Sequence, residues 1–374
     1  MQKTDTQMLL YRARLLLEEG RYEAALIVLE TIHTEDEKQF RDVSYLLGWG
    51  YIQCKRWHDA RRVLAPILEQ STEQAEQETP LERERLALYL LQLGLAAVKL
   101  AHYEDASLHF TVCLKVLHDR RVHLPAVRIK ARYSLAMTCL MRGLFTTAIG
   151  HYEEALRLCQ HYHDERELPH IYHGLCDAYP HVGDFVKAYL AGEKALHLYE
   201  EAGDRQMEAR IHSMLGRICM RLSDYREASD HYTESLAIAN SHNGPTMAML
   251  NCAWLAELRM TEGRVEEARR YCQRALEAME RTTDQHMQGR VYHSIGKVTH
   301  EQARQAEGSA RHLLLEETAT WYERAVEKLN VTQASADMAE VYGGWGQVLE
   351  ELGRAADAIV CWRRGYEVMS SALQ

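Results

Sequence analysis

A short layout of small residues recurs along the chain and limits the folds that it can adopt. Each copy has a small residue inside an apolar stretch and then a turn, and eight of the nine copies have an alanine 12 positions after the small residue. The small residues are Ala13, Gly48, Gly94, Ala136, Cys176, Gly216, Ala256, Gly296 and Gly346. The alanines are Ala25, Ala60, Ala106, Ala148, Ala188, Ala228, Ala268 and Ala358. Self-similarity of this kind indicates a stack of repeated helical units.

Close packing of paired helices explains the layout. A small residue midway along a first helix lets the backbone of a second helix approach, and we expect the alanine of the second helix to meet it. Larger residues before each alanine, such as Trp57 and Tyr225, are expected to fill the space beside the pair. Glycine supplies the turn conformation that other residues resist. It stands there at Gly20, Gly143, Gly183, Gly263 and Gly353.

With these residues the sequence resembles the tetratricopeptide repeat family over nearly its whole length. The alanines from Ala148 to Ala268 recur every 40 residues, whereas the common unit of the family has about 34. The longer unit looks like the subclass found in bacterial Rap and NprR regulators and in kinesin light chains. The resemblance implies an all-α fold, a right-handed superhelical solenoid of about nine helix-turn-helix repeats.

We expect one continuous solenoid over residues 1–374, without a separate domain. Repeat eight carries an insertion at 303–314, and a glutamate-rich segment at 69–86 lengthens the junction between repeats two and three. Pro180 lies in the first helix of repeat five, where we expect it to kink the helix near its end. The predicted repeats are roughly 6–38, 41–73, 87–120, 129–162, 169–202, 209–242, 249–282, 289–332 and 339–372.

Charge and cysteine usage exclude several classes of protein. The formal net charge of −10 argues against nucleic acid as a partner, because nucleic-acid-binding domains usually carry a basic face. Nine scattered cysteines without a CxxC pair predict reduced thiols in a cytoplasmic protein. No stretch has the roughly 20 apolar residues of a membrane span. The first 20 residues carry charges within their apolar run, so we expect no signal peptide.

No motif predicts catalysis. The sequence lacks GxxxxGK[ST], GxSxG and HExxH patterns. His161, His163, Asp164, His170 and His173 are close enough in sequence to suggest a metal site. The many histidines make such a coincidence common, so we interpret them as solvated or groove-lining. We therefore predict a protein that is not an enzyme, with no catalytic residues, metal or cofactor.

The first helices of tetratricopeptide arrays line the concave face that binds peptides, so the resemblance implies a partner-binding groove there. Inward positions are expected six, three and two residues before the small residue, and one, four and five after it. The groove residues predicted in repeats five to eight are His170, His173, Asp177, His181, Arg210, Arg217, Arg221, Trp254, Glu257, Arg290, His293, Lys297 and His300.

This stretch is basic and rich in histidine within an acidic chain. It predicts an acidic peptide or a carboxylate-bearing ligand, because the planar fork of arginine matches a carboxylate. Trp254 could serve as an aromatic anchor. The alternative is a charged solvent face that serves solubility alone. No asparagine lies at these inward positions, so the specificity of peptide-pheromone receptors is not carried over.

We predict a non-catalytic scaffold or adaptor that binds a peptide or protein segment in its groove. One alternative is a peptide-sensing regulator that changes its superhelix shape when the ligand binds. Another is an accessory or inhibitory subunit of an enzyme encoded elsewhere. The identity of the partner and the oligomeric state stay open at this stage.

Overall fold

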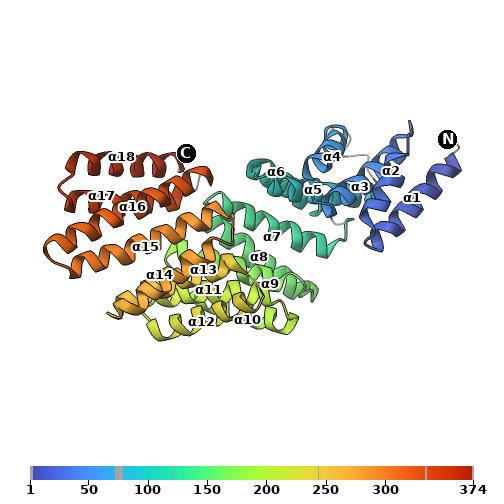
Figure 1. Cartoon of the computed structure of the whole chain (residues 1–374). Coiled ribbons are helices and arrows are strands. Elements are labelled where there is room, and N and C mark those ends of the chain that lie inside the picture. Colours follow the sequence, from blue (N-terminus) through green and yellow to red (C-terminus); the bar gives the residue numbers. More distant parts are fainter. Residues whose placement is uncertain (1–2, 72–78, 120, 243, 333–334, 373–374) are drawn as a thin grey trace. The chain divides into compact units, whose positions relative to one another are not determined.

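A computed structural model describes residues 3–71, 79–119, 121–242, 244–332 and 335–372. Within these ranges the chain forms eighteen α-helices and one 3-10 helix, and no strand. The residues divide into two compact units: Met1–Asp184, here called unit 1, and Phe185–Gln374, called unit 2. The boundary falls at the turn inside repeat five. Figure 1 labels the helices along the chain.

In both units consecutive helices pair into hairpins, whose first helix we call A and second helix B. Unit 1 contains α1 (Lys3–Glu18), α2 (Tyr22–Glu30), α3 (Glu37–Gln53), α4 (Trp57–Ser71), α5 (Pro80–Lys99), α6 (Tyr103–Val116), α7 (Pro125–Met141), α8 (Phe145–Tyr162), α9 (Leu168–Ala178) and η1 (Tyr179–Val182). Unit 2 contains α10 (Phe185–Ala202), α11 (Arg205–Arg221), α12 (Tyr225–Ser241), α13 (Pro245–Thr261), α14 (Val265–Met279), α15 (Gln285–Gln305), α16 (Gly308–Thr332), α17 (Ser335–Glu351) and α18 (Ala355–Ala372). The predicted all-α repeat fold is confirmed.

The small residues of the A helices allow the predicted close approach, but a different side chain covers them. A Cβ built on Gly216 would lie 2.6 Å from the ring of Tyr232, four residues after Ala228. The same relation holds for Leu64 over Gly48, Phe110 over Gly94 and Trp362 over Gly346. The atoms nearest to the small position thus belong to this covering residue, whereas the sequence led us to expect the alanine there, with residues such as Trp57 and Tyr225 beside it. The eight alanines are fully buried.

The turns between A and B helices follow the predicted chemistry. Gly20, Gly143, Gly183, Gly263 and Gly353 all have φ between 73° and 79°, in the left-handed region that glycine enters without steric cost. Other hairpins reach the same region with Lys55, Ala101 and Ser223. The turn geometry is thus common to these hairpins, and glycine is the residue that adopts it with the least steric strain.

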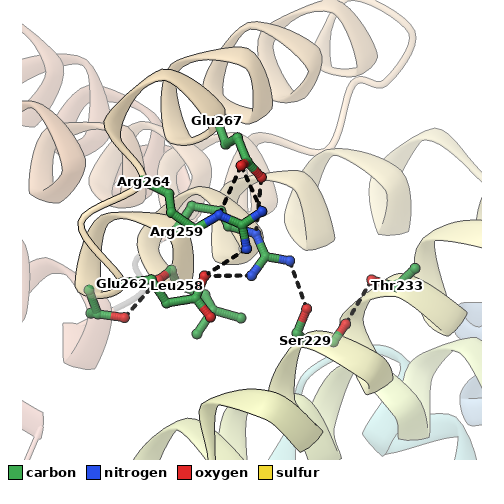
Figure 2. A network of polar contacts seen from close by, with 8 residues as sticks. Ser229, Thr233, Leu258, Arg259, Glu262, Arg264 and Glu267 are labelled. Atoms are coloured by element: carbon green, nitrogen blue, oxygen red, sulfur yellow. Dashed lines mark hydrogen bonds and ion pairs between the residues drawn. The ribbon is translucent and has the colours of Figure 1, made fainter.

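Charged residues lock the hairpin of α13 and α14 to the preceding helix (Figure 2). Arg259 donates to Glu262 at 2.7 Å and to the Ser229 hydroxyl of α12 at 2.8 Å. Arg264 pairs with Glu267 across 2.6 Å at the start of α14. The side chain of Arg259 is only 11% exposed, so its charge is used within the structure and is not available to a ligand.

The irregular segments are accommodated in helices or lie partly outside the described residues. The insertion predicted at 303–314 lengthens both helices of repeat eight. The A helix, α15, ends at Gln305, and the B helix, α16, begins at Gly308. Pro180 lies in η1, where the A helix of repeat five changes from α to 3-10 geometry at its end. The structure places Pro180 at the helix end, and the expected kink stays a prediction. Of the glutamate-rich junction at 69–86, residues 72–78 are outside the described ranges.

Candidate ligand-binding surface

Six of the predicted groove residues come together on three A helices of unit 2. Arg217 belongs to α11, Trp254 and Glu257 to α13, and Arg290, His293 and Lys297 to α15. Arg217, Glu257 and Lys297 each follow the small residue of their helix directly, so the repeat brings them into register. We call these six residues the Trp254 cluster.

Trp254 lies between aromatic and cationic neighbours. The guanidinium carbon of Arg217 is 5.4 Å from the centroid of the Trp254 ring, and that of Arg290 is 5.6 Å from it. The Tyr232 ring packs against the indole at 5.6 Å. Cation–π contacts at such distances favour ordered guanidinium groups. Arg217 is solvent-exposed, and within the described ranges it has no hydrogen-bond or ion-pair partner.

Lys297 and Glu257 neutralise each other beside the tryptophan. The Lys297 ammonium lies 3.0 Å from a Glu257 carboxylate oxygen and 4.0 Å from Glu340 of α17. Burial alone would lower the pKa of Lys297, but these two carboxylates raise it above its ordinary value. Lys297 therefore stays protonated over the physiological range. Arg217 is left as the exposed cation of the cluster whose charge a ligand could use.

His293 remains uncharged at neutral pH. Burial and then the nearby Lys297 lower its pKa to about 4, and Glu257 and Asp337 only partly oppose this. The ring packs 5.8 Å from that of Tyr322. His293 therefore does not add positive charge near pH 6, and ligand binding at this cluster should not strengthen through its titration.

The burial of neutral His293 should make the protein less stable in acid. In an unfolded chain a histidine protonates near pH 6.5, whereas folded His293 stays neutral to about pH 4. The unfolded state thus binds more protons as pH falls through this window, and this lowers the free energy of unfolding. Between pH 7.5 and 5.0 we expect His293 to account for a loss of about 1–2 kcal/mol.

Urea unfolding at the two pH values measures this loss, with His293→Leu as the comparison. The variant should lose the part of the pH dependence that His293 contributes. Burial also lowers the pKa of four other histidines, whose contributions to the pH dependence should remain: His109, His151, His212 and His231. An unchanged pH slope in His293→Leu would contradict the assignment.

The other predicted residues of unit 2 lie outside the cluster. Arg221 contacts the Phe185 ring at 5.4 Å, and Arg210 is exposed on α11. His300 is buried, and its Nε2 lies 3.0 Å from Glu351, which also binds Arg311 at 3.0 Å. His300 therefore has a structural partner, and we leave it out of the candidate surface.

The predicted residues of unit 1 form a separate group on α9 and η1. His170 stacks on Tyr133 with the ring centroids 6.0 Å apart. His181 stacks on Phe145 at 4.0 Å with the rings nearly parallel. Asp177 is exposed, and His173 is half-buried. These rings stabilise contacts within unit 1.

Sequence reasoning missed Asp337, which acts on both arginines of the cluster. Burial raises the pKa of Asp337, but the hydrogen bond from His286 at 2.7 Å and the charges of Arg290 and Arg217 bring it below its ordinary value. Asp337 lies nine residues before Gly346, outside the positions expected to face inward. No signal in the sequence marked it.

The thiols and the histidine-rich segment offer no reactive group. Burial raises the pKa of the Cys113 thiol to about 12 and that of Cys252 to about 11, which disfavours the nucleophilic thiolate. Among the described residues no three His, Cys, Asp or Glu side chains are placed to hold a metal ion. Asp164 instead pairs with Arg166 across 2.6 Å. No helix within the described ranges is long and apolar enough to span a membrane.

Comparison with known proteins agrees with the repeat architecture. A family model described as tetratricopeptide repeat matches residues 167–241 and 246–312. No curated protein matches the chain. The fold is similar to that of the apo form of RapI, with a TM-score of 0.71 at 13% identity over 98% of this chain and 97% of RapI.

Two further structures share the fold at similarly low identity. The apo form of the quorum sensor NprR from B. thuringiensis has a TM-score of 0.67 at 15% identity, over 98% of this chain and 99% of that one. A Rap protein complexed with competence and sporulation factor gives 0.64 at 15%, over 99% of each chain. The resemblance found in the sequence is confirmed: residues 167–241 and 246–312 match the tetratricopeptide repeat model, and the fold of the chain is similar to that of Rap and NprR proteins.

Proposed function

We propose that this chain is a non-catalytic interaction protein, whose A-helix surface in unit 2 binds a carboxylate-bearing peptide or protein segment at the Trp254 cluster. The observation that carries the proposal is the pair of guanidinium groups placed against Trp254. An indole flanked by cations can receive an apolar side chain of the ligand beside its carboxylate.

The surrounding charges determine where an incoming carboxylate pairs. Glu257 is neutralised by Lys297 at 3.0 Å, and Asp337 interacts electrostatically with both arginines. Arg217 is the more accessible of the two because it is solvent-exposed, whereas Arg290 is half-buried. An incoming carboxylate would therefore pair first with Arg217.

Titration of the protein with fluorescein-labelled hexaglutamate tests this proposal. Screening weakens interactions between exposed charges, so we expect affinity to fall by about 10-fold between 50 and 500 mM NaCl. Hexalysine and hexaserine labelled in the same way should bind at least about 10-fold more weakly at low salt. Equal binding of all three peptides would refute the proposal.

A peptide-sensing regulator is the second candidate, because two proteins of similar fold are described as a quorum sensor and as a complex with competence and sporulation factor. In this case the ligand would bind the A-helix surface and would also change the arrangement of the repeats. Small-angle scattering with and without bound peptide separates the candidates: compaction supports sensing, and an unchanged radius of gyration supports scaffolding.

A further inference from the structure

The outer face of α18 exposes residues whose counterparts inside unit 2 are buried. Trp362, Tyr366 and Met369 lie 4, 8 and 11 positions after Ala358, as Tyr232, Leu236 and Ala239 do after Ala228 of α12. Their exposed fractions are 40%, 69% and 52%, against 1%, 6% and 4% for the counterparts. α18 therefore has the stacking surface of an interior B helix, and among the described residues no helix covers it.

Interior repeats show what covers such a surface. Tyr232 packs on Trp254 of the next A helix, at the position two residues before its small residue. At the same position Gly174 faces Tyr152, and Gly344 faces Tyr322 at 3.1 Å from an added Cβ. A large side chain of each of these B helices thus contacts one fixed position of the following A helix. The surface of α18 is shaped for an A helix of the same repeat type.

The chain has an A helix with the complementary surface uncovered, namely α1. Met8, Tyr11 and Leu15 occupy the positions of Asn251, Trp254 and Leu258 of α13, counted from Ala13 and Ala256. Asn251 and Leu258 are fully buried, whereas Met8 and Tyr11 are 67% exposed and Leu15 is 41% exposed. Beside Leu15 a surface pocket of about 430 Å³ opens between α1 and α2.

A buried hydrogen bond joins α12 to α13 inside unit 2, and the corresponding positions of α18 and α1 carry apolar residues. In unit 2 the Asn251 amide donates to the Ser235 hydroxyl at 2.8 Å. Counted from the small residue of the A helix, Met8 occupies the position of Asn251. Counted from the alanine of the B helix, Gly365 occupies the position of Ser235. The two surfaces can therefore meet without leaving that buried polar pair unsatisfied.

We infer that α18 of one copy of this chain stacks on α1 of a second copy, continuing the repeat stack from head to tail. The interior register places Trp362 of the first copy against Tyr11 of the second. This contact is heterologous, because different surfaces meet, so each assembly still has one free surface of each kind. Association is then open-ended and rises with concentration. The arrangement is independent of ligand binding at the Trp254 cluster.

Sedimentation velocity of the chain from about 1 to 200 µM, a range that brackets micromolar association, tests the inference together with two variants that each block one surface. We expect the wild type to form dimers and longer species progressively. Tyr366→Lys alone and Met8→Lys alone should stay monomeric. Leu313→Lys, which charges an equally exposed residue of α16, should assemble like the wild type.

The decisive sample is an equimolar mixture of Tyr366→Lys and Met8→Lys. The first variant retains a free α1 surface and the second a free α18 surface, so the mixture should form dimers and nothing longer. Circular dichroism confirms that each variant is folded. A monomeric wild type at the highest concentration, or a mixture that stays monomeric, would overturn the inference. So would variants that each still dimerise alone.

Discussion

Replacing Gly216 by alanine is expected to destabilise the protein by about 1–3 kcal/mol, because it overpacks a junction that has no room for a methyl group. The added Cβ would lie 2.6 Å from the Tyr232 ring. That ring is 1% exposed and packs on Trp254, so it cannot move without disturbing the next repeat. Gly216→Leu should cost more than Gly216→Ala. Urea unfolding followed by circular dichroism measures both.

Gly343→Ala is the matched control for this prediction. Gly343 also lies in an A helix, α17, but nothing stands within 4 Å of an added Cβ. Alanine there should stabilise the helix by up to about 1 kcal/mol, since alanine has the higher helix propensity. If both variants changed stability in the same direction, close packing at the small position would not explain the repeat.

Reversing the charge of Arg217 is expected to weaken hexaglutamate binding by about 10- to 100-fold. This corresponds to the loss of one charge-assisted hydrogen bond, about 1.5–3 kcal/mol, together with added repulsion. Arg217 has no hydrogen-bond or ion-pair partner within the described ranges, and its guanidinium lies against the Trp254 ring. Arg217→Glu should therefore leave the fold intact. Fluorescence anisotropy of the labelled peptide measures the change.

Arg226→Glu makes the same charge change at an exposed position of α12 and serves as the control. It alters the net charge of the protein equally but lies on a B helix, away from the predicted binding face. We expect its affinity to remain within about 2-fold of the wild type. Equal losses in the two variants would mean that hexaglutamate responds to overall charge and that no local site exists.

The backbone architecture was predictable because close helix packing restricts certain positions of the sequence to small residues at a regular spacing. Gly216 and Ala228 have little freedom to vary when two helices approach this closely, and Gly263 marks a turn with positive φ. The covering residue was harder to predict. Tyr232 lies one turn beyond Ala228, and only the angle between the helices decides which turn of the B helix meets the glycine.

The candidate surface could be predicted only in part. Counting from the small residue brought Arg217, Trp254 and Lys297 onto neighbouring helices in register. The same counting included His300, which is buried against Glu351, and omitted Asp337. The ionisation of such groups depends on partners from other repeats, and no periodic pattern in one helix records those partners.

Photo-crosslinking with a benzophenone-tagged hexaglutamate locates the bound peptide on the protein, because mass spectrometry identifies the residues that the tag has labelled. Binding at the Trp254 cluster should give crosslinks on α11, α13 and α15, around Arg217, Trp254 and Arg290, and these crosslinks should be lost in Arg217→Glu. Crosslinks confined to unit 1, or to the B helices α12 and α14, would contradict it.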